Sequence, residues 1–226
     1  MRIFLNETEV DFKRRGIGDF YIGSGEEADI YYYKGRALKI YKNPTKCILD
    51  HDLAKELMEI DTKRLLVPRE IIYNSRKKYI GYSREFVENY YKEYVGKMKM
   101  SGFIREMSYL EEDIKKLSKH KIDIEDLNMS NILINNGIYI SDLGSFIKMD
   151  ELRKKQVLSN NKTTFKTFVI EDLIPSTTTI SRPQFRPLGG QLYLEDSISD
   201  YLSSNCQNDN EKVNTFIKKM SLKLSK

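Results

Sequence analysis

The 226-residue chain has no tryptophan, two cysteines, two histidines and five prolines. A chain of this length can bury a core without covalent links, so we interpret Cys47 and Cys206 as reduced thiols. Together with His51 and His120 they match no C-x-x-C or H-x-x-x-H spacing, which argues against a zinc site. No apolar run approaches the roughly 18 residues that a membrane-spanning helix needs.

The charge pattern is mixed. The chain carries 38 Lys and Arg against 33 Asp and Glu, a formal net charge of +5, and 40% of its residues are hydrophobic. Nucleic-acid binding usually shows as a concentrated basic face, and no such face is visible. The first residues become charged before a signal-peptide core can form. We therefore expect a cytoplasmic globular protein of one large or two small domains, with neither a membrane nor a nucleic acid as partner.

The first part of the chain shows strand patterns, rich in β-branched and aromatic residues and separated by turns. Between them, Asn43-Pro44-Thr45 opens a helical pattern with apolar residues spaced by four and three, ending before Pro68. The five expected strands are residues 20–22, 30–33, 37–41, 70–73 and 79–82. These patterns predict a five-stranded antiparallel sheet with one helix.

From about residue 88 the periodicity becomes helical, with Tyr91 to Val95 first and then a long amphipathic segment over 103–117. A short hairpin of residues 132–134 and 138–140 interrupts it, around an Asn-Gly turn. Residues 159–191 are rich in small and polar residues and predict irregular structure. A last helical pattern covers 211–224. The two halves together predict an α+β protein.

Two features of the first half are candidates for chemistry. Gly23-Ser24-Gly25 lies between two strands, where it is either a simple turn or a flap whose main-chain amides approach a triphosphate. Lys39 lies in an apolar strand, either facing solvent or held over phosphate by a carboxylate of the following helix. Of the candidates Glu56 and Glu59, Glu56 borders the apolar stripe and is our choice.

The strongest local pattern is residues 124–134 leading into Ser141-Asp142-Leu143-Gly144. Asp126 and Asn131 are five residues apart before a strand, and the hairpin is expected to bring Asn131 beside Asp142. Such oxygen ligands suit Mg²⁺, and Asp126 can orient a hydroxyl nucleophile. The alternative is a polar loop with a capping Asp and a turn-forming Asn.

In order and spacing, these pieces resemble the signature set of protein kinases over about residues 20–146. Ala37-Leu38-Lys39-Ile40 looks like the V-A-I-K strand, Arg84 to Val87 like the hinge, and Asp142-Leu143-Gly144 like D-F-G. The resemblance implies catalytic roles for Asp126, Lys39 and Glu56, and a metal site at Asn131 and Asp142. It implies ATP contacts by Ile22, Gly23, Ser24, Gly25, Ile30, Ala37, Lys39, Glu85, Val87 and Leu133.

The chain also departs from the family. Ala28 replaces the third glycine, Ile124-Glu125 replaces the His-Arg before the catalytic Asp, and Asn128 replaces the loop lysine. No A-P-E follows Phe146. Small bacterial and phage kinase-like proteins are similarly shortened there. The missing arginine implies that phosphorylation of an activation loop is not the switch, and Asn128 affects either the rate or the substrate class.

We therefore expect an α+β, two-lobed protein-kinase-like fold, with residues 1–87 as the small lobe and 88–226 as a reduced helical lobe containing the loop 124–146. The expected function is ATP- and Mg²⁺-dependent transfer of the γ-phosphate to a Ser or Thr hydroxyl of a protein. Two alternatives stay open. One is a small-molecule kinase of the same superfold, and the other is a pseudokinase acting as a nucleotide-binding or scaffold module.

Overall fold

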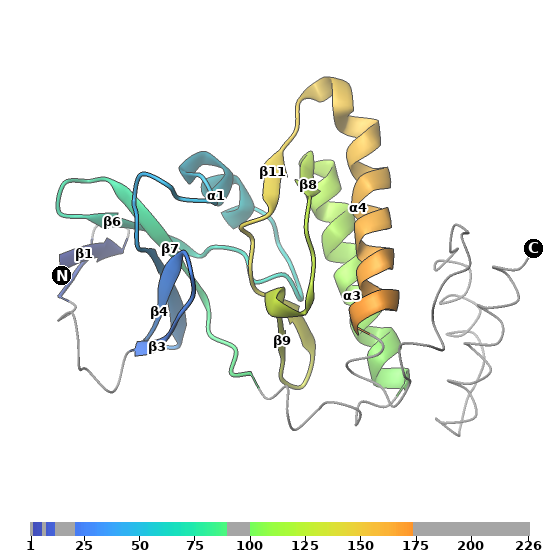
Figure 1. The fold of residues 1–226 in the computed structure, drawn as a ribbon, viewed down its shortest axis with the longest axis horizontal. Helices are drawn as coiled ribbons and strands as arrows, with labels where there is room; N and C mark the ends of the chain where they lie inside the picture. Colours follow the sequence, from blue (N-terminus) through green and yellow to red (C-terminus); the bar gives the residue numbers. More distant parts are fainter. Residues whose placement is uncertain (1, 6–7, 12–20, 90–99, 174–226) are drawn as a thin grey trace, which may run out of the picture.

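The computed structural model describes residues 2–5, 8–11, 21–89 and 100–173. It confirms the α+β class. Figure 1 shows an antiparallel sheet on one side, two long helices on the other, and short strands between them. The expected helical patterns at Tyr91 to Val95 and at 211–224 lie outside the described residues, as does Phe20 at the start of the first expected strand.

The sheet has seven strands rather than the five expected, in the order β2-β1-β6-β7-β5-β4-β3. The two additional strands come from the N-terminal segment, whose short apolar pattern we did not interpret as strand; β1 pairs antiparallel with β6. The strands are β1 (Arg2–Leu5), β2 (Thr8–Asp11), β3 (Tyr21–Ser24), β4 (Ala28–Tyr33), β5 (Arg36–Tyr41), β6 (Glu70–Asn74) and β7 (Tyr79–Glu85).

Helix α1 (His51–Met58) is shorter than the sequence pattern indicated. Asp50 caps its N-terminus, because the side-chain oxygen accepts hydrogen bonds from the main-chain N–H groups of Asp52 at 2.8 Å and Leu53 at 2.9 Å. Residues before this cap form turns instead of helix. The buried face of α1 consists of Leu53, Ala54 and Leu57.

The second half contains α3 (Met100–Lys119), β8 (Ile122–Ile124), a 3₁₀ turn at Met129–Asn131, β9 (Ile132–Ile134), β10 (Ile138–Ile140), β11 (Phe146–Lys148), a 3₁₀ turn at Glu151–Arg153 and α4 (Lys154–Phe168). The long amphipathic helix and the hairpin of β9 and β10 are confirmed. So is the hairpin of β6 and β7. Strand β11 returns to pair with β8, which encloses the segment between them in a closed loop.

The prediction of irregular structure from residue 159 was wrong for its first part. Helix α4 continues to Phe168, and a π-helical turn follows at Val169–Leu173. The apolar spacing was missed because the buried stripe of Val157, Phe165 and Phe168 includes the polar Asn161. That asparagine is fully buried and hydrogen-bonded.

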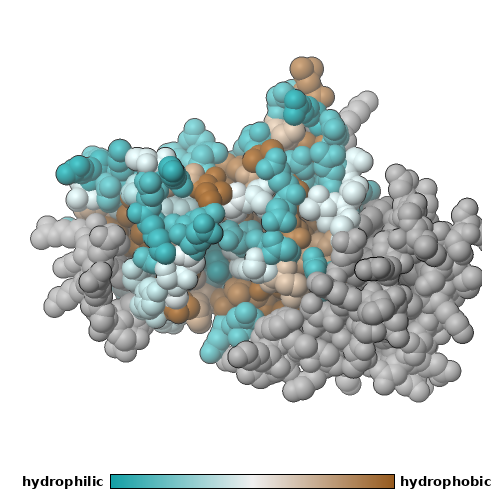
Figure 2. All heavy atoms as spheres, viewed as in Figure 1, coloured by the Kyte–Doolittle hydropathy of each residue, from teal (hydrophilic) through white to brown (hydrophobic). Residues whose placement is uncertain are grey.

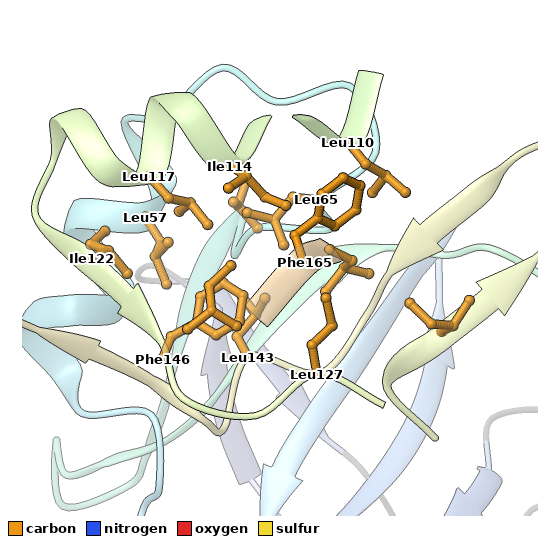
Figure 3. Packing of buried hydrophobic residues seen from close by; sticks show 14 of the residues in the cluster. Leu57, Leu65, Leu110, Ile114, Leu117, Ile122, Leu127, Leu143, Phe146 and Phe165 are labelled. Atoms are coloured by element: carbon orange, nitrogen blue, oxygen red, sulfur yellow. The ribbon is translucent and has the colours of Figure 1, made fainter. Parts of the chain in front are cut away.

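The largest hydrophobic cluster joins the sheet, α1, α3, α4 and the short strands. In Figure 3, Leu57 of α1 lies near Leu117 and Ile122, and Phe146 and Leu143 fill the space beside them. A smaller cluster on the other sheet face holds six residues, Ile3, Leu5, Leu38, Ile40, Ile72 and Ile80. The core therefore positions α1 and the segment 142–146 against each other.

No helix among the described residues is long and apolar enough to cross a membrane. On the face shown in Figure 2, hydrophilic residues cover most of the described surface.

Candidate functional site

An ion pair links the sheet to the turn after β10. The Lys39 ammonium on β5 donates to Asp142 Oδ1 at 2.7 Å, across 103 positions of sequence. Lys39 is buried, and Asp142 is half-buried. Asp142 Oδ1 also accepts a hydrogen bond from the main-chain N–H of Gly144 at 3.0 Å. The structure thus brings together the strand lysine and the Asp-Leu-Gly aspartate, a pairing that the sequence argument did not predict.

This pairing changes both protonation equilibria in favour of the charged forms. Burial alone disfavours the Lys39 ammonium, but the acidic groups around it, Tyr82, Asp142 and Glu27, outweigh burial and raise the pKa of Lys39. Burial also disfavours the Asp142 carboxylate, but Lys39 and the Gly144 N–H lower the pKa of Asp142 below its ordinary value. Both groups are therefore charged at neutral pH.

The strand register sets the position of Lys39. Its neighbour across the β5–β7 ladder is Tyr82, and the next pair along is Ala37 with Arg84. Residues directly opposite in an antiparallel pair share a face, so these four side chains point the same way. Gly81 lets the strands meet here, because a side-chain carbon at this position would collide with the Lys39 carbonyl oxygen.

Glu56 does not make the expected contact with Lys39. Its carboxylate pairs with the Lys148 ammonium of β11, and His120 Nδ1 lies 3.5 Å from Glu56 Oε1. Since α1 is short and directs Leu53, Ala54 and Leu57 into the core, Glu56 lies at the border of that face, within reach of β11. The alternative acid, Glu59, is an exposed residue at the C-terminal end of α1.

Asp126 lies in the loop between β8 and the 3₁₀ turn, and its exposed carboxylate has a partner two residues away. Asn128 Nδ2 donates to Asp126 Oδ2 at 2.9 Å. The other end of the Asn128 amide accepts from the Ser130 N–H at 2.9 Å. Asn128, which stands where the resemblance expects a lysine, therefore fixes the orientation of the Asp126 carboxylate.

The β9–β10 hairpin places Asn131 opposite Ser141, the residue before Asp142. The Ser141 N–H and hydroxyl both donate to the Asn131 carbonyl oxygen, at 2.7 and 3.0 Å, and Ile132 pairs with Ile140 next to them. The Asn131 Oδ1 atom accepts from the Asn128 N–H at 2.9 Å, and its second lone pair can bind a cation.

Asn131 and Asp142 carry oxygen donors of the kind that Mg²⁺ binds. The described residues contain no group of three or more His, Cys, Asp or Glu side chains suited to hold a metal ion. Mg²⁺ takes one or two protein oxygens together with phosphates and water. The Asp142 carboxylate and the Asn131 amide oxygen fit that requirement.

Helix α4 holds the strand that leads into this loop. Asn161 Oδ1 accepts from the Ile124 N–H at 2.7 Å, and Asn161 Nδ2 donates to the Ile122 carbonyl at 2.8 Å. At the other end of the loop, the Ser145 hydroxyl donates to the Asp126 carbonyl. The loop bearing Asp126 is thus fixed on both sides, although α4 carried no sequence signal for this function.

The glycine hairpin lies between two strands, as expected. Gly25 N–H donates to the Ala28 carbonyl at 2.9 Å, and the Ser24 hydroxyl donates to Asp29 Oδ1 at 2.7 Å. Strand β3 is the sheet edge and has a bulge between Tyr21 and Gly23. Ile22 is exposed, and Ile30 on β4 is half-buried.

The residues expected around a nucleotide base lie on three neighbouring segments. Ala37 is buried on β5, and Glu85 ends β7 opposite Arg36. Val87 follows, and Asn89 Oδ1 then accepts from the Ile134 N–H at 3.2 Å, next to Leu133. This bond brings the segment after β7 beside β9.

Two charged residues at the site were missed by the sequence argument. Arg84 is buried on the same face as Lys39, and burial lowers its pKa. The sequence argument placed Arg84 at the start of the expected hinge, and its polar neighbours Ser83 and Glu85 gave no sign that it is buried. Glu27, in the glycine hairpin, faces Gly144, and no pattern in the sequence distinguished it from Glu26.

No family model matches the chain, and no curated protein matches it.

Proposed function

We propose that this protein is an ATP- and Mg²⁺-dependent phosphotransferase with a two-lobed, protein-kinase-like fold. The observation that carries the proposal is the 2.7 Å contact of Lys39 with Asp142. It joins a strand cation to a carboxylate from the other half of the chain, and our proposal assigns that carboxylate to the metal site. Asn131 precedes the strand that pairs with the one before Asp142, and Asp126 lies five residues before Asn131, which supports assigning all four residues to one site.

In this proposal Lys39 binds the α- and β-phosphate oxygens, and the amides of the Gly23–Gly25 hairpin cover the phosphates. Asp142 and Asn131 hold Mg²⁺, which neutralises the charge of the transferring phosphoryl group. Ala37 and Leu133 contact the two faces of the adenine, and main-chain groups near Glu85 and Val87 bind its edge. Catalysis in such a site comes mainly from positioning and charge stabilisation.

Asp126 accepts the hydrogen bond of the acceptor hydroxyl and orients its oxygen toward the γ-phosphate. The 2.9 Å hydrogen bond from Asn128 supports this role, because it fixes the carboxylate without supplying a charge. The proposed acceptor is a Ser or Thr hydroxyl of a protein. A neutral Asn128 in place of a lysine favours, as the second candidate, a small-molecule hydroxyl.

The test is transfer of labelled γ-phosphate from ATP in the presence of Mg²⁺. The acceptors are the protein itself, a generic protein and a panel of small molecules, and Asp126→Asn is the matched variant. Label on protein that the variant abolishes supports the proposal. Label on a small molecule alone supports the second candidate. Nucleotide binding without any transfer would replace the proposal with the pseudokinase alternative.

A further inference from the structure

A buried arginine on strand β7 has no carboxylate partner. Arg84 is only 8% exposed, and its guanidinium carries five N–H donors. Among the described residues, its side chain donates one hydrogen bond, from Nη1 to the Glu85 carbonyl oxygen at 3.3 Å, and forms no ion pair. Because a buried charge without a partner is costly, this position calls for acceptor atoms from a bound molecule.

Two other arginines of the chain show the usual arrangement. Arg36 pairs with Glu70, and Arg64 pairs with Glu106. Both arginines are half-buried, so water also reaches them. Arg84 is more buried than either and lacks such an acid.

The strand register places Arg84 at the level of the proposed base binding site. Arg84 lies opposite Ala37, whereas Lys39 lies opposite Tyr82, one pair further along the same face of the sheet. In the proposed function Ala37 contacts the base and Lys39 contacts the phosphates. The hydrogen bond to the Glu85 carbonyl also directs the guanidinium to the segment that binds the edge of the base.

The two purines differ at the edge that such a group would meet. Guanine presents two acceptors, O6 and N7, whereas adenine presents N7 as an acceptor and the N6 amine as a donor. An arginine has donors only, so it can donate twice to guanine and once to adenine. The Glu85 carbonyl could accept from the adenine amine, but it already accepts from Arg84.

We propose that Arg84 is a specificity-determining residue whose guanidinium donates to O6 and N7 of guanine, so that the site binds GTP more tightly than ATP. The inference rests on the proposed function and names a second phosphate donor for it. ATP remains a ligand, held by N7 alone on this side of the base.

The experiment measures the dissociation constants of Mg·GTP, Mg·ITP and Mg·ATP by competition with a fluorescent nucleotide. The base of ITP has O6 and N7 but lacks the 2-amino group of guanine, so it isolates the proposed contact. The proteins are the wild type, Arg84→Met and Arg36→Met. Arg36→Met is the matched control, because Arg36 precedes Ala37 on β5 and therefore points to the opposite face of the sheet.

We expect the wild type to bind Mg·GTP and Mg·ITP about tenfold more tightly than Mg·ATP, which is within the range that a bidentate arginine contact discriminates. Arg84→Met should bring this ratio close to one, mainly by weakening GTP and ITP, while Arg36→Met preserves it. Equal or tighter binding of ATP by the wild type would overturn the proposal. So would an equal weakening of all three nucleotides in Arg84→Met, which would indicate a phosphate contact or a structural role.

A urea midpoint verifies that Arg84→Met folds, since replacing a buried charge by an apolar side chain is often neutral or stabilising. If it does not fold, Arg84→Lys takes its place. Lysine keeps the charge but not the planar pair of donors, so the preference for GTP should fall. An unchanged preference in Arg84→Lys would overturn the bidentate contact.

Binding and transfer together separate this inference from the proposed function. Phosphate transfer by a wild type that prefers ATP would retain the proposed function and overturn the inference. A preference for GTP that depends on Arg84, without transfer to any acceptor, would retain the inference and overturn the proposed function.

Discussion

Asn161 of α4 binds strand β8 through both ends of its side-chain amide, accepting from the Ile124 N–H and donating to the Ile122 carbonyl. Asn161 Nδ2 also donates to the Ser118 hydroxyl of α3 at 2.9 Å. One fully buried side chain therefore ties together the two long helices and the strand that precedes Asp126.

Replacing Asn161 by Leu should destabilise the protein strongly. The substitution keeps the volume but leaves the Ile124 N–H and the Ile122 carbonyl buried without their partner. Each buried group left unsatisfied costs about 1–3 kcal/mol. Urea unfolding should show the loss as a lower midpoint. Thr163→Ala, at an exposed position of the same helix, is the control and should change the midpoint little.

Gly81→Ala should also destabilise the protein, through the main chain. The added carbon would collide with the Lys39 carbonyl oxygen. The atoms in its way belong to the main chain of Lys39 and Ile40, which cannot move without disturbing the β5–β7 ladder. We expect a loss of several kcal/mol, at the upper end of single substitutions. Gly23→Ala is the matched control, because nothing lies within 4 Å of its added carbon. Equal unfolding midpoints for the two variants would contradict the close approach.

The Lys39–Asp142 pair predicts a defined pH dependence of stability. The folded pKa of Asp142 is lowered, so its contribution is complete above the unfolded value of about 3.9 and is lost as pH falls through the folded value. The folded pKa of Lys39 is raised, so its contribution is complete below about 10.4 and is lost as pH rises further. Urea midpoints should therefore fall at both extremes.

In the double variant Lys39→Met with Asp142→Asn, the urea midpoint should fall less at acidic and at alkaline pH than in the wild type. The other titrating groups stay in place. A profile parallel to that of the wild type would show that other residues determine it.

Asp142→Asn should abolish the Mg²⁺-dependent part of nucleotide stabilisation. A ligand that binds the folded state raises the melting temperature, and the rise grows with the logarithm of its affinity; the neutral amide is a poorer Mg²⁺ ligand than the carboxylate. The measurement is the melting temperature with ATP alone and with Mg·ATP. Glu59→Gln, at an exposed acid outside the site, serves as the control. Full Mg²⁺-dependent stabilisation of Asp142→Asn would contradict the metal assignment.

The fold was predictable wherever the apolar residues recur with one regular spacing. The hairpin of β9 and β10 has its Asn-Gly turn, and α3 has a continuous apolar stripe. Helix α4 was missed because Asn161 occupies a core position that looks polar until its three partners are known. Strands β1 and β2 were missed because each is only four residues long, and β1 joins the sheet through a long-range pairing with β6 that so short a pattern does not predict.

Part of the candidate site was also predictable from a local sequence pattern. The register of the β9–β10 hairpin puts Asn131 opposite Ser141, the residue before Asp142. Whether Glu56 reaches Lys39 depends instead on how α1 and β11 lie against each other. Glu56 had the correct helical phase to border the core, but Lys148, distant in sequence, binds it. Helix periodicity indicates which face is buried and not which charge meets it.

The last prediction concerns Asn128, which stands where the protein-kinase pattern that the sequence resembles has a lysine. Asn128→Ala removes the hydrogen bond to Asp126 Oδ2 and frees the carboxylate to rotate. Among the described residues, the side-chain hydrogen bonds of Asn128 go to Asp126 and Ser130 and none goes to Lys39, Asp142 or the glycine hairpin. We therefore expect kcat to fall about tenfold while the dissociation constant of Mg·ATP stays unchanged. Ser130→Ala is the control, since Ser130 touches Asn128 and not Asp126. Equal losses of nucleotide binding and kcat in Asn128→Ala would indicate a collapsed loop and contradict a specific hold on Asp126.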